Sequence, residues 1–400
     1  MNHSKDVIVF AGALYDAPLW TNRQHIATSL AERGWRVLYV EPRLFLLRML
    51  FRYPGGRWSK TGRSLGGGWH WLLRQVAPQR VRPNLWVQAQ ANLIPGSRRI
   101  PFVGRLNHVL WNAWHVRLHA WELGFREPVL LIYDTEAAEF LDDFPKSRVV
   151  YDCVDDHRVQ AGIERNSALV EKEESAIAAR AAVISVTTSP LLERFSKIHR
   201  NVQLVPNAAD VEAFSGRPAH EPRDIAAIPH PRIGTVGALD VYKVDVELLQ
   251  KIASEHPEWH FVLIGPVDYS GTGGAESVRK LGQLSNVHFL GPKPREEVPS
   301  YVHAFDVAII PYRDSPYNRA SFPLKFWEFL AAGKPIVASG LPSLEPYRHL
   351  VTLTSSADAF ARGIQEALER GAEGRDARIA ESKRHTWDMR VTVLEHLLSD

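Results

Sequence analysis

The 400-residue chain has a single cysteine, Cys153, so it cannot form an internal disulfide bond. Such cysteine usage is typical of the reducing cytoplasm. The chain has no run of 18 apolar residues, so we expect no membrane-spanning helix. Its apolar N-terminal stretch, residues 7–14, is short for a signal peptide. With 45% hydrophobic and 23% charged residues, the composition excludes wholesale disorder.

Acidic residues are absent between Glu41 and Glu122, where 13 lysine and arginine residues occur. The rest of the chain is net acidic, although the formal net charge of the whole chain is only +3. A basic region on an otherwise ordinary protein indicates an anionic partner, which could be membrane lipid, phosphate or nucleic acid.

Several cofactor signatures are also missing. No Walker lysine and no Gly-x-Gly-x-x-Gly sequence follows a predicted strand, which argues against ATP and NAD. His115 and His119 are four positions apart, but no third metal ligand is evident. The sequence therefore predicts neither a nucleotide cofactor of these kinds nor a metal site.

Apolar runs alternate with helical patterns along the chain, which is typical of α/β proteins with parallel sheets. A strand at 7–12, a helix at 24–33 and a strand at 37–40 form an opening βαβ unit. After a segment rich in proline, histidine and arginine, residues 215–232, a second α/β series begins with a strand at 233–236.

We predict an α/β fold of two doubly wound Rossmann-like domains facing a central cleft. The first domain is expected over residues 1–214 and the second over residues 215–375. A C-terminal helix over residues 376–400 is expected to cross back to the first domain. Ligands of such sheets bind beyond the carboxyl ends of the strands.

A helix is predicted over residues 322–332, with its start marked by Ser321 and Pro323. Serine caps free backbone N–H groups, and proline tolerates the first helical turn. Lys325 and Glu328 lie three positions apart on one face near this start. A helix N-terminus with a nearby lysine suits a phosphate, and a carboxylate one turn deeper can accept both ribose hydroxyls. The same spacing also fits an ordinary surface Lys–Glu pair.

The sequence Ser321-Phe-Pro-Leu-Lys325-Phe-Trp-Glu328-Phe-Leu-Ala-Ala-Gly333-Lys-Pro-Ile-Val337 resembles the donor-site signature of GT-B glycosyltransferases. It is most similar to the family 4-like, or group 1, bacterial enzymes that build teichuronic acid and other exopolysaccharides. Further matching segments occur in the family's order: residues 24–25, 151–156, 205–214, 233–239, 286–291 and 306–312.

The resemblance implies that the first domain, residues 1–214, binds the acceptor and that the second, residues 215–375, binds the nucleotide sugar. It also implies that Glu328 binds the donor ribose and that Lys325, with the helix start, holds the diphosphate. Lys243, six residues after Gly237, corresponds to a second phosphate-binding lysine of many relatives. The full set of expected donor-site residues is Lys325, Glu328, Lys243, Gly237, Ser321 and Asn207. Ala320 stands where relatives with a Glu-x7-Glu motif carry a first glutamate that contacts the sugar.

Carboxylates cluster in residues 152–157, at the end of a predicted first-domain strand. Clustered carboxylates can raise one another's pKa and supply a general base for an acceptor hydroxyl. Asp155 and Asp156 are therefore the predicted catalytic residues. The same residues also fit a capped loop in which an aspartate accepts backbone N–H bonds.

The predicted function is transfer of a sugar from a UDP- or GDP-linked donor to a lipid-linked or saccharide acceptor in cell-surface polysaccharide biosynthesis. No cofactor and no metal are expected, since the absence of an Asp-x-Asp sequence disfavours the metal-dependent glycosyltransferase architecture. One alternative is a nucleotide-sugar epimerase of the same fold, which would not need a long basic, tryptophan-rich region. Others are a nucleic-acid-binding protein, which leaves most of the chain unexplained, and a catalytically inactive relative, because of Ala320.

The basic region also predicts membrane attachment. Residues 43–53 place arginines four or five positions apart among large apolar residues, so a helix here could lie in the membrane interface. Tryptophans that favour the headgroup level follow: Trp69, Trp71, Trp111, Trp114 and Trp121. We expect a cytoplasmic protein held peripherally at an anionic inner membrane face, without a nucleic-acid partner. The alternative is a core helix whose arginines face solvent.

Overall fold

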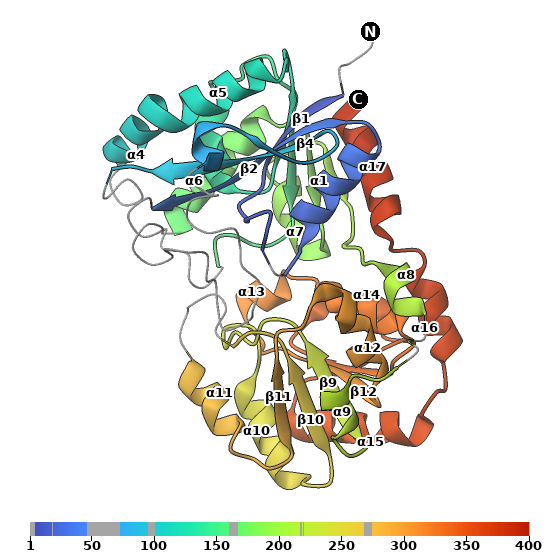
Figure 1. The fold of residues 1–400 in the computed structure, drawn as a ribbon. Coiled ribbons are helices and arrows are strands. Elements are labelled where there is room, and N and C mark those ends of the chain that lie inside the picture. The colour runs from blue at the N-terminus through green and yellow to red at the C-terminus, as the bar shows by residue number, and fades with distance from the viewer. Residues whose placement is uncertain are drawn as a thin grey trace.

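The computed structural model describes residues 5–17, 19–45, 73–94, 101–159, 167–216, 218, 220–267 and 274–399. Two α/β domains lie one above the other in Figure 1, each built around its own sheet. The strands in the middle of each sheet, such as β5 and β12, are buried apolar runs, as expected where helices cover both faces of a parallel sheet.

The first domain contains an eight-stranded sheet in the order β3-β4-β2-β1-β5-β6-β7-β8. All neighbouring strands are parallel except β3 and β4, which form an antiparallel edge. The strands are β1 (Asp6–Phe10), β2 (Arg36–Phe45), β3 (Gln79–Arg82), β4 (Leu85–Asn92), β5 (Val129–Ile132), β6 (Val149–Cys153), β7 (Val183–Val186) and β8 (Val202–Leu204).

The helices of the first domain alternate with the strands, as the sequence predicted. Residues 101–122 form one continuous helix, in which α4, the π-helical segment η1 and α5 follow one another. The helices are α1 (Asn22–Glu32), α4 (Pro101–Asn107), η1 (His108–Asn112), α5 (Ala113–Glu122), η2 (Thr135–Phe140), α6 (Ser167–Arg180) and α7 (Ser189–Ser196).

The second domain contains a six-stranded, fully parallel sheet in the order β11-β10-β9-β12-β13-β14. The strands are β9 (Arg232–Val236), β10 (His260–Ile264), β11 (Val287–Gly291), β12 (Val307–Pro311), β13 (Ile336–Ser339) and β14 (Thr352–Thr354). The helices are α8 (Val211–Ser215), α9 (Arg223–Ala226), α10 (Val246–Glu255), α11 (Ala275–Leu281), η3 (Arg295–Glu297), α12 (Val298–His303), α13 (Pro316–Arg319), α14 (Leu324–Ala331), η4 (Pro342–Tyr347), α15 (Ala357–Arg370) and α16 (Arg375–Ser382).

Both sheets reverse their strand order next to their first strand. In the first domain β1 lies between β2 and β5, and in the second β9 lies between β10 and β12. Helices that follow such neighbouring strands cover opposite faces of the sheet and leave a crevice at the carboxyl ends. The fold thus places one ligand crevice in each domain.

The last helix, α17 (Trp387–Ser399), returns to the first domain, where Figure 1 shows it beside α1. Trp387, Val391 and Leu394 join the hydrophobic core of the first domain. The buried guanidinium of Arg390 donates two hydrogen bonds to the carboxylate of Asp152, at 2.9 and 2.8 Å. This paired charge fixes α17 against the end of β6.

The chain passes between the domains at two adjoining segments. Ala208 belongs to the first core and Ala209 to the second, whereas the sequence placed the boundary at residue 214. The backbone N–H of Ala209 donates a hydrogen bond to the carbonyl of His385 at 3.0 Å. This bond joins the segment that enters the second domain to the segment that returns to the first. No helix within the described ranges is long and apolar enough to cross a membrane.

Candidate active site

A cleft of about 860 Å³ lies between the two domains. It is lined by segments that follow β6, β9 and β12, by the hinge after β8 and by the start of α14. Seven of the eight residues predicted for the site line it: Asp155, Asn207, Gly237, Lys243, Ser321, Lys325 and Glu328. Asp156 does not.

Lys325 and Gly237 lie against each other on the second-domain side of the cleft. Gly237 follows β9 with a φ of +122°, a conformation that other residues adopt only with strain. A Cβ at this position would lie 3.0 Å from the Nζ atom of Lys325. Because glycine has no Cβ, the ammonium group of Lys325 can occupy this space.

Burial shifts the pKa values of Lys325 and Glu328 toward neutrality. It lowers the pKa of Lys325 to about 8, with the charge of Lys243 acting in the same direction and Glu328 opposing it. It raises the pKa of Glu328 to about 7, against the opposing charges of Lys325 and Arg295. An anion bound beside Lys325 would stabilise the ammonium form, so the site suits a negatively charged ligand.

Ser321 does not cap α14 as predicted, because Pro323 occupies the N-cap position. The chain before the helix makes its own turn, and the Ser321 hydroxyl donates to the carbonyl of Tyr317 at 2.9 Å. Pro323 has no side-chain acceptor, so this N-cap residue does not bond the first-turn N–H groups of α14. N–H groups that the N-cap side chain leaves free favour an anion at this end of the helix.

Asn207 connects the hinge to this same turn. Its side-chain amide donates to the carbonyl of Phe322 at 2.7 Å. Its buried side-chain oxygen accepts no hydrogen bond from any residue that the structure describes. Lys243 lies with its ammonium group over the rings of Tyr242 and Tyr317, at 5.3 and 5.1 Å from the ring centroids. Both residues therefore lie where the sequence expected donor contacts.

Asp155 extends from the end of β6 across the cleft. Its Oδ1 atom accepts a hydrogen bond from the Tyr317 hydroxyl of the second domain at 3.1 Å, and the Ser321 hydroxyl lies 3.4 Å away. Asp155 is partly exposed and lines the cleft. A carboxylate in this position can reach a ligand held between the domains.

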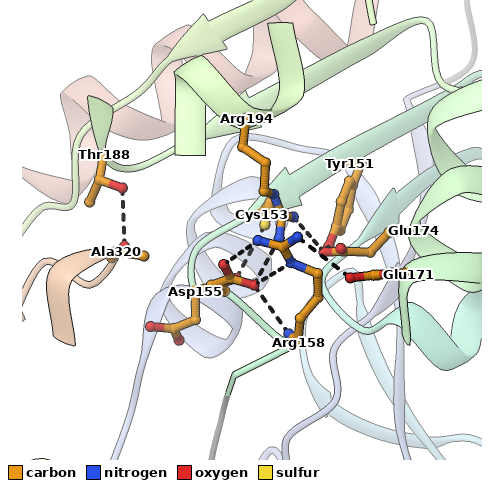
Figure 2. A network of polar contacts seen from close by, with 10 residues as sticks. Tyr151, Cys153, Asp155, Arg158, Glu171, Glu174, Thr188, Arg194 and Ala320 are labelled. Atoms are coloured by element: carbon orange, nitrogen blue, oxygen red, sulfur yellow. Dashed lines mark hydrogen bonds and ion pairs between the residues drawn. The ribbon is translucent and has the colours of Figure 1, made fainter. Parts of the chain in front are cut away.

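Asp156 belongs to a separate ion-pair network. Its carboxylate accepts from Arg158 at 2.9 Å and from Arg194 at 2.8 Å, and Arg194 also bonds Glu174. Burial alone would raise its pKa, but the bonds from Arg158 and the charge of Arg194 hold it below the usual range. Figure 2 shows the Asp155 carboxylate outside this network. Asp156 is thus poorly placed to act as a base, and Asp155 is the better of the two predicted candidates.

Four further residues line the cleft but were not predicted to take part: Trp20, His25, Arg295 and Trp387. The guanidinium of Arg295 lies 5.0 Å from the ring centroid of Trp20, and its charge acts on both His25 and Glu328. His25 stacks on Trp387 at 4.2 Å, and burial lowers its pKa to about 3, so this imidazole is neutral. Only His25 had a signal in the sequence, as part of the matched pair at residues 24–25.

Together, two doubly wound domains with their strand ends facing one cleft define the GT-B fold. Residues 230–370 match the family model described as "Glycosyl transferases group 1". This match lies within the second domain and confirms the resemblance inferred from the sequence.

Among curated proteins, the chain is similar to the teichuronic acid biosynthesis glycosyltransferase TuaH of Bacillus subtilis, with 34% identity over 207 residues. That match covers 49% of this chain and 51% of TuaH. A second relative is the D-inositol 3-phosphate glycosyltransferase of Corynebacterium jeikeium, with 33% identity over 38% of this chain and 39% of that protein. The chain thus spans about half, or less, of the length of these curated relatives.

Solved structures match almost the whole chain. The sucrose-phosphate synthase of Thermosynechococcus elongatus superposes with a TM-score of 0.70 at 17% identity, covering 98% of this chain and 97% of that one. Anabaena HepE in complex with UDP gives a TM-score of 0.67 at 14% identity, covering 98% and 99%. These likenesses confirm the predicted GT-B fold. None of the comparisons supports the epimerase or nucleic-acid-binding alternatives.

Proposed function

We propose that the protein is a glycosyltransferase that moves a sugar from a nucleoside-diphosphate sugar to a lipid-linked or saccharide acceptor in cell-surface polysaccharide biosynthesis. The observation that carries this proposal is the contact of Lys325 with Gly237 at the start of an uncapped helix, one turn before Glu328. This arrangement presents positive charge and a carboxylate to a cleft large enough for a nucleotide sugar.

The donor roles follow from chemistry and position. The ammonium groups of Lys325 and Lys243 and the N–H groups of α14 bind the diphosphate, and Glu328 accepts hydrogen bonds from the ribose hydroxyls. A UDP donor is supported by the UDP complex of HepE, a protein that shares this fold.

Departure of the nucleoside diphosphate builds up negative charge on its oxygens. Lys325, Lys243 and the α14 terminus can stabilise that charge from fixed positions. We therefore propose transfer without a metal ion. Turnover that persists in excess EDTA would support this part of the proposal, and loss of turnover restored by a divalent cation would contradict it.

The acceptor lies on the first-domain side of the cleft in this proposal, where Asp155 takes the proton from its attacking hydroxyl. The name of the Bacillus relative, which refers to teichuronic acid biosynthesis, supports a saccharide or lipid-linked saccharide acceptor. A protein acting on such acceptors would work at the cytoplasmic face of the membrane.

The activity is tested by incubating the purified protein with radiolabelled nucleotide sugars and with membrane lipids or oligosaccharides as acceptors. We expect release of nucleoside diphosphate matched by label in the acceptor fraction. Conversion of the donor into a second nucleotide sugar without transfer would instead identify an epimerase. Donor binding without either reaction would identify an inactive relative.

The pKa values of the donor site predict a maximum in nucleoside-diphosphate affinity between about pH 7 and pH 8. Above about pH 8 the free protein loses the Lys325 proton that the bound diphosphate requires, so affinity should fall by up to tenfold per pH unit. Below about pH 7 Glu328 becomes protonated and accepts ribose hydroxyls less well. Calorimetry across this pH range measures the loss of affinity on both sides of the maximum. Affinity for the bare nucleoside should not fall above pH 8. Affinity for the nucleoside diphosphate that stays constant above pH 8 would contradict the role of Lys325.

A further inference from the structure

One surface of the first domain exposes an unusual number of large apolar side chains. Of the 14 such side chains exposed in the described part of the chain, eight lie between residues 73 and 121. Six of them are on the continuous helix formed by α4, η1 and α5: Phe102, Leu106, Val109, Leu110, Trp114 and Trp121. Phe102 and Trp121 are 75% and 73% exposed. The remaining six of the 14 are scattered over other parts of the molecule.

These six residues form one stripe, which we call the α4–α5 stripe. Most follow one another at intervals of three to four residues, the spacing that keeps side chains on one face of a helix. In an α-helix, residues four apart are rotated by about 40° around the helix axis, so a four-residue repeat gradually leaves the face where it began. The π-helical turn at η1 has more residues per turn and reverses part of this rotation. The opposite face is buried and includes His108, Asn112 and His119. The stripe is thus a surface of the helix that the domain core leaves uncovered.

The charge along most of the stripe is positive. Arg105 and Arg117 are exposed on the same helix, and its one acidic residue is the exposed Glu122 at the C-terminal end of α5. An apolar stripe with tryptophans, flanked by cations along most of its length, matches the chemistry of a bilayer surface containing anionic lipids. A protein partner would have to supply both an apolar groove and a negative rim.

We propose that the α4–α5 stripe is the face by which the protein docks onto a membrane that contains anionic lipid. The helix lies in the plane of the headgroups, its apolar side chains enter the acyl boundary, and Arg105 and Arg117 contact lipid phosphates. Over its 22 residues this contact is about 33 Å long. The inference deepens the proposed function by naming the membrane as a partner of the acceptor domain.

This surface differs from the one expected from the sequence. Most of the predicted interfacial segment, residues 43–53, lies outside the described residues, as do Trp69 and Trp71. Arg43 is buried and paired with Glu136 at 3.2 Å and Glu139 at 2.8 Å, so its guanidinium cannot contact lipid. Trp114 and Trp121 belong to the stripe, while Trp111 is partly buried.

The test is co-sedimentation of the whole protein with vesicles of phosphatidylcholine alone or mixed with phosphatidylglycerol. Binding should require the anionic lipid and weaken with salt. The variant F102S/W114S/W121S should lose binding by about tenfold or more, because it removes the largest interfacial side chains. The variant R105Q/R117Q should lose about fivefold per arginine. The matched control M389S/V393S changes exposed apolar residues of α17, 49% and 41% exposed, and should bind vesicles as the unmodified protein does.

Unchanged vesicle binding by the triple serine variant, or no vesicle binding by the unmodified protein, would overturn the proposal. A dimer that the triple serine variant dissociates would assign the stripe to a second copy of the chain instead. Nucleoside-diphosphate affinity should be the same in all these variants, because the stripe is outside the cleft lining. Loss of vesicle binding with intact donor affinity thus separates this inference from the proposed activity.

Discussion

Replacing Asp155 with asparagine is expected to lower the turnover number by about 10²–10⁴-fold, the usual loss when a general base is removed. Nucleoside-diphosphate affinity should change little, because the donor groups Lys325 and Glu328 lie on the opposite domain. The asparagine side-chain oxygen can still accept the hydrogen bond from the Tyr317 hydroxyl, so the contact between the domains survives. Steady-state transfer rates, together with calorimetry on the donor site, measure the two effects separately.

Two control variants separate this role from a structural one. Tyr317→Phe removes the hydrogen bond to Asp155 but keeps the carboxylate, so its transfer rate should fall far less than that of Asp155→Asn. Asp156→Asn should instead lower the free energy of unfolding by about 1–3 kcal/mol, since it weakens bonds from two guanidinium groups, and should retain turnover. Near-normal transfer by Asp155→Asn would place the base elsewhere or indicate a route that needs none.

Lys325→Ala is expected to weaken binding of the nucleoside diphosphate by about 10–100-fold, the range for a hydrogen bond to a charged group. The bare nucleoside should bind almost as before, because it lacks the phosphates that face the ammonium group. Glu328→Gln should instead weaken both ligands to a similar degree, since both carry the ribose. Calorimetric titration of each variant with each ligand makes the comparison.

The stability of the unliganded Lys325→Ala protein should change little near neutral pH, because two effects oppose each other. The pKa of Lys325 falls from its ordinary value to about 8 on folding, so at lower pH the folded state holds a charge that burial disfavours, and the variant no longer bears this cost. The variant also loses the charge that opposes the raised pKa of Glu328. Thermal unfolding of the unliganded variant therefore serves as the control for its affinity. Equal losses of affinity for nucleoside and diphosphate in this variant would contradict the assigned role of Lys325.

The sequence predicted the elements that depend on local pattern. Continuous apolar runs correctly identified strands such as β1 and β9, and Lys325 and Glu328 of the predicted donor motif line the cleft. Both features can be recognised in the sequence because buried parallel strands and helix termini carry strong short-range signals.

The sequence could not predict contacts that depend on tertiary packing. Asp155 and Asp156 are adjacent carboxylates with the same local pattern, yet one faces the cleft and the other is held by Arg158 and Arg194. Arg194 is 38 residues from Asp156 in sequence. Ser321 has the residue type of an N-cap, but the turn from α13 to α14 gives that position to Pro323.

The basic region illustrates the same limit. Its charge is visible in the sequence, but exposure decides which of its residues can meet a partner. Arg43 is buried in ion pairs, whereas Arg105 and Arg117 lie in the open beside apolar side chains. Composition therefore predicts a class of partner but not the surface that would bind it.

The central claim is that the interdomain cleft binds a nucleoside-diphosphate sugar through the second domain. It is tested most directly by thermal unfolding of the purified protein with a panel of nucleotide sugars, because a ligand that binds only the folded state raises the melting temperature. We expect at least one UDP- or GDP-linked sugar to raise it, and the rise to be reduced in Lys325→Ala and Glu328→Gln. Stabilisation by no member of the panel, or equal stabilisation of the unmodified protein and both variants, would contradict the claim.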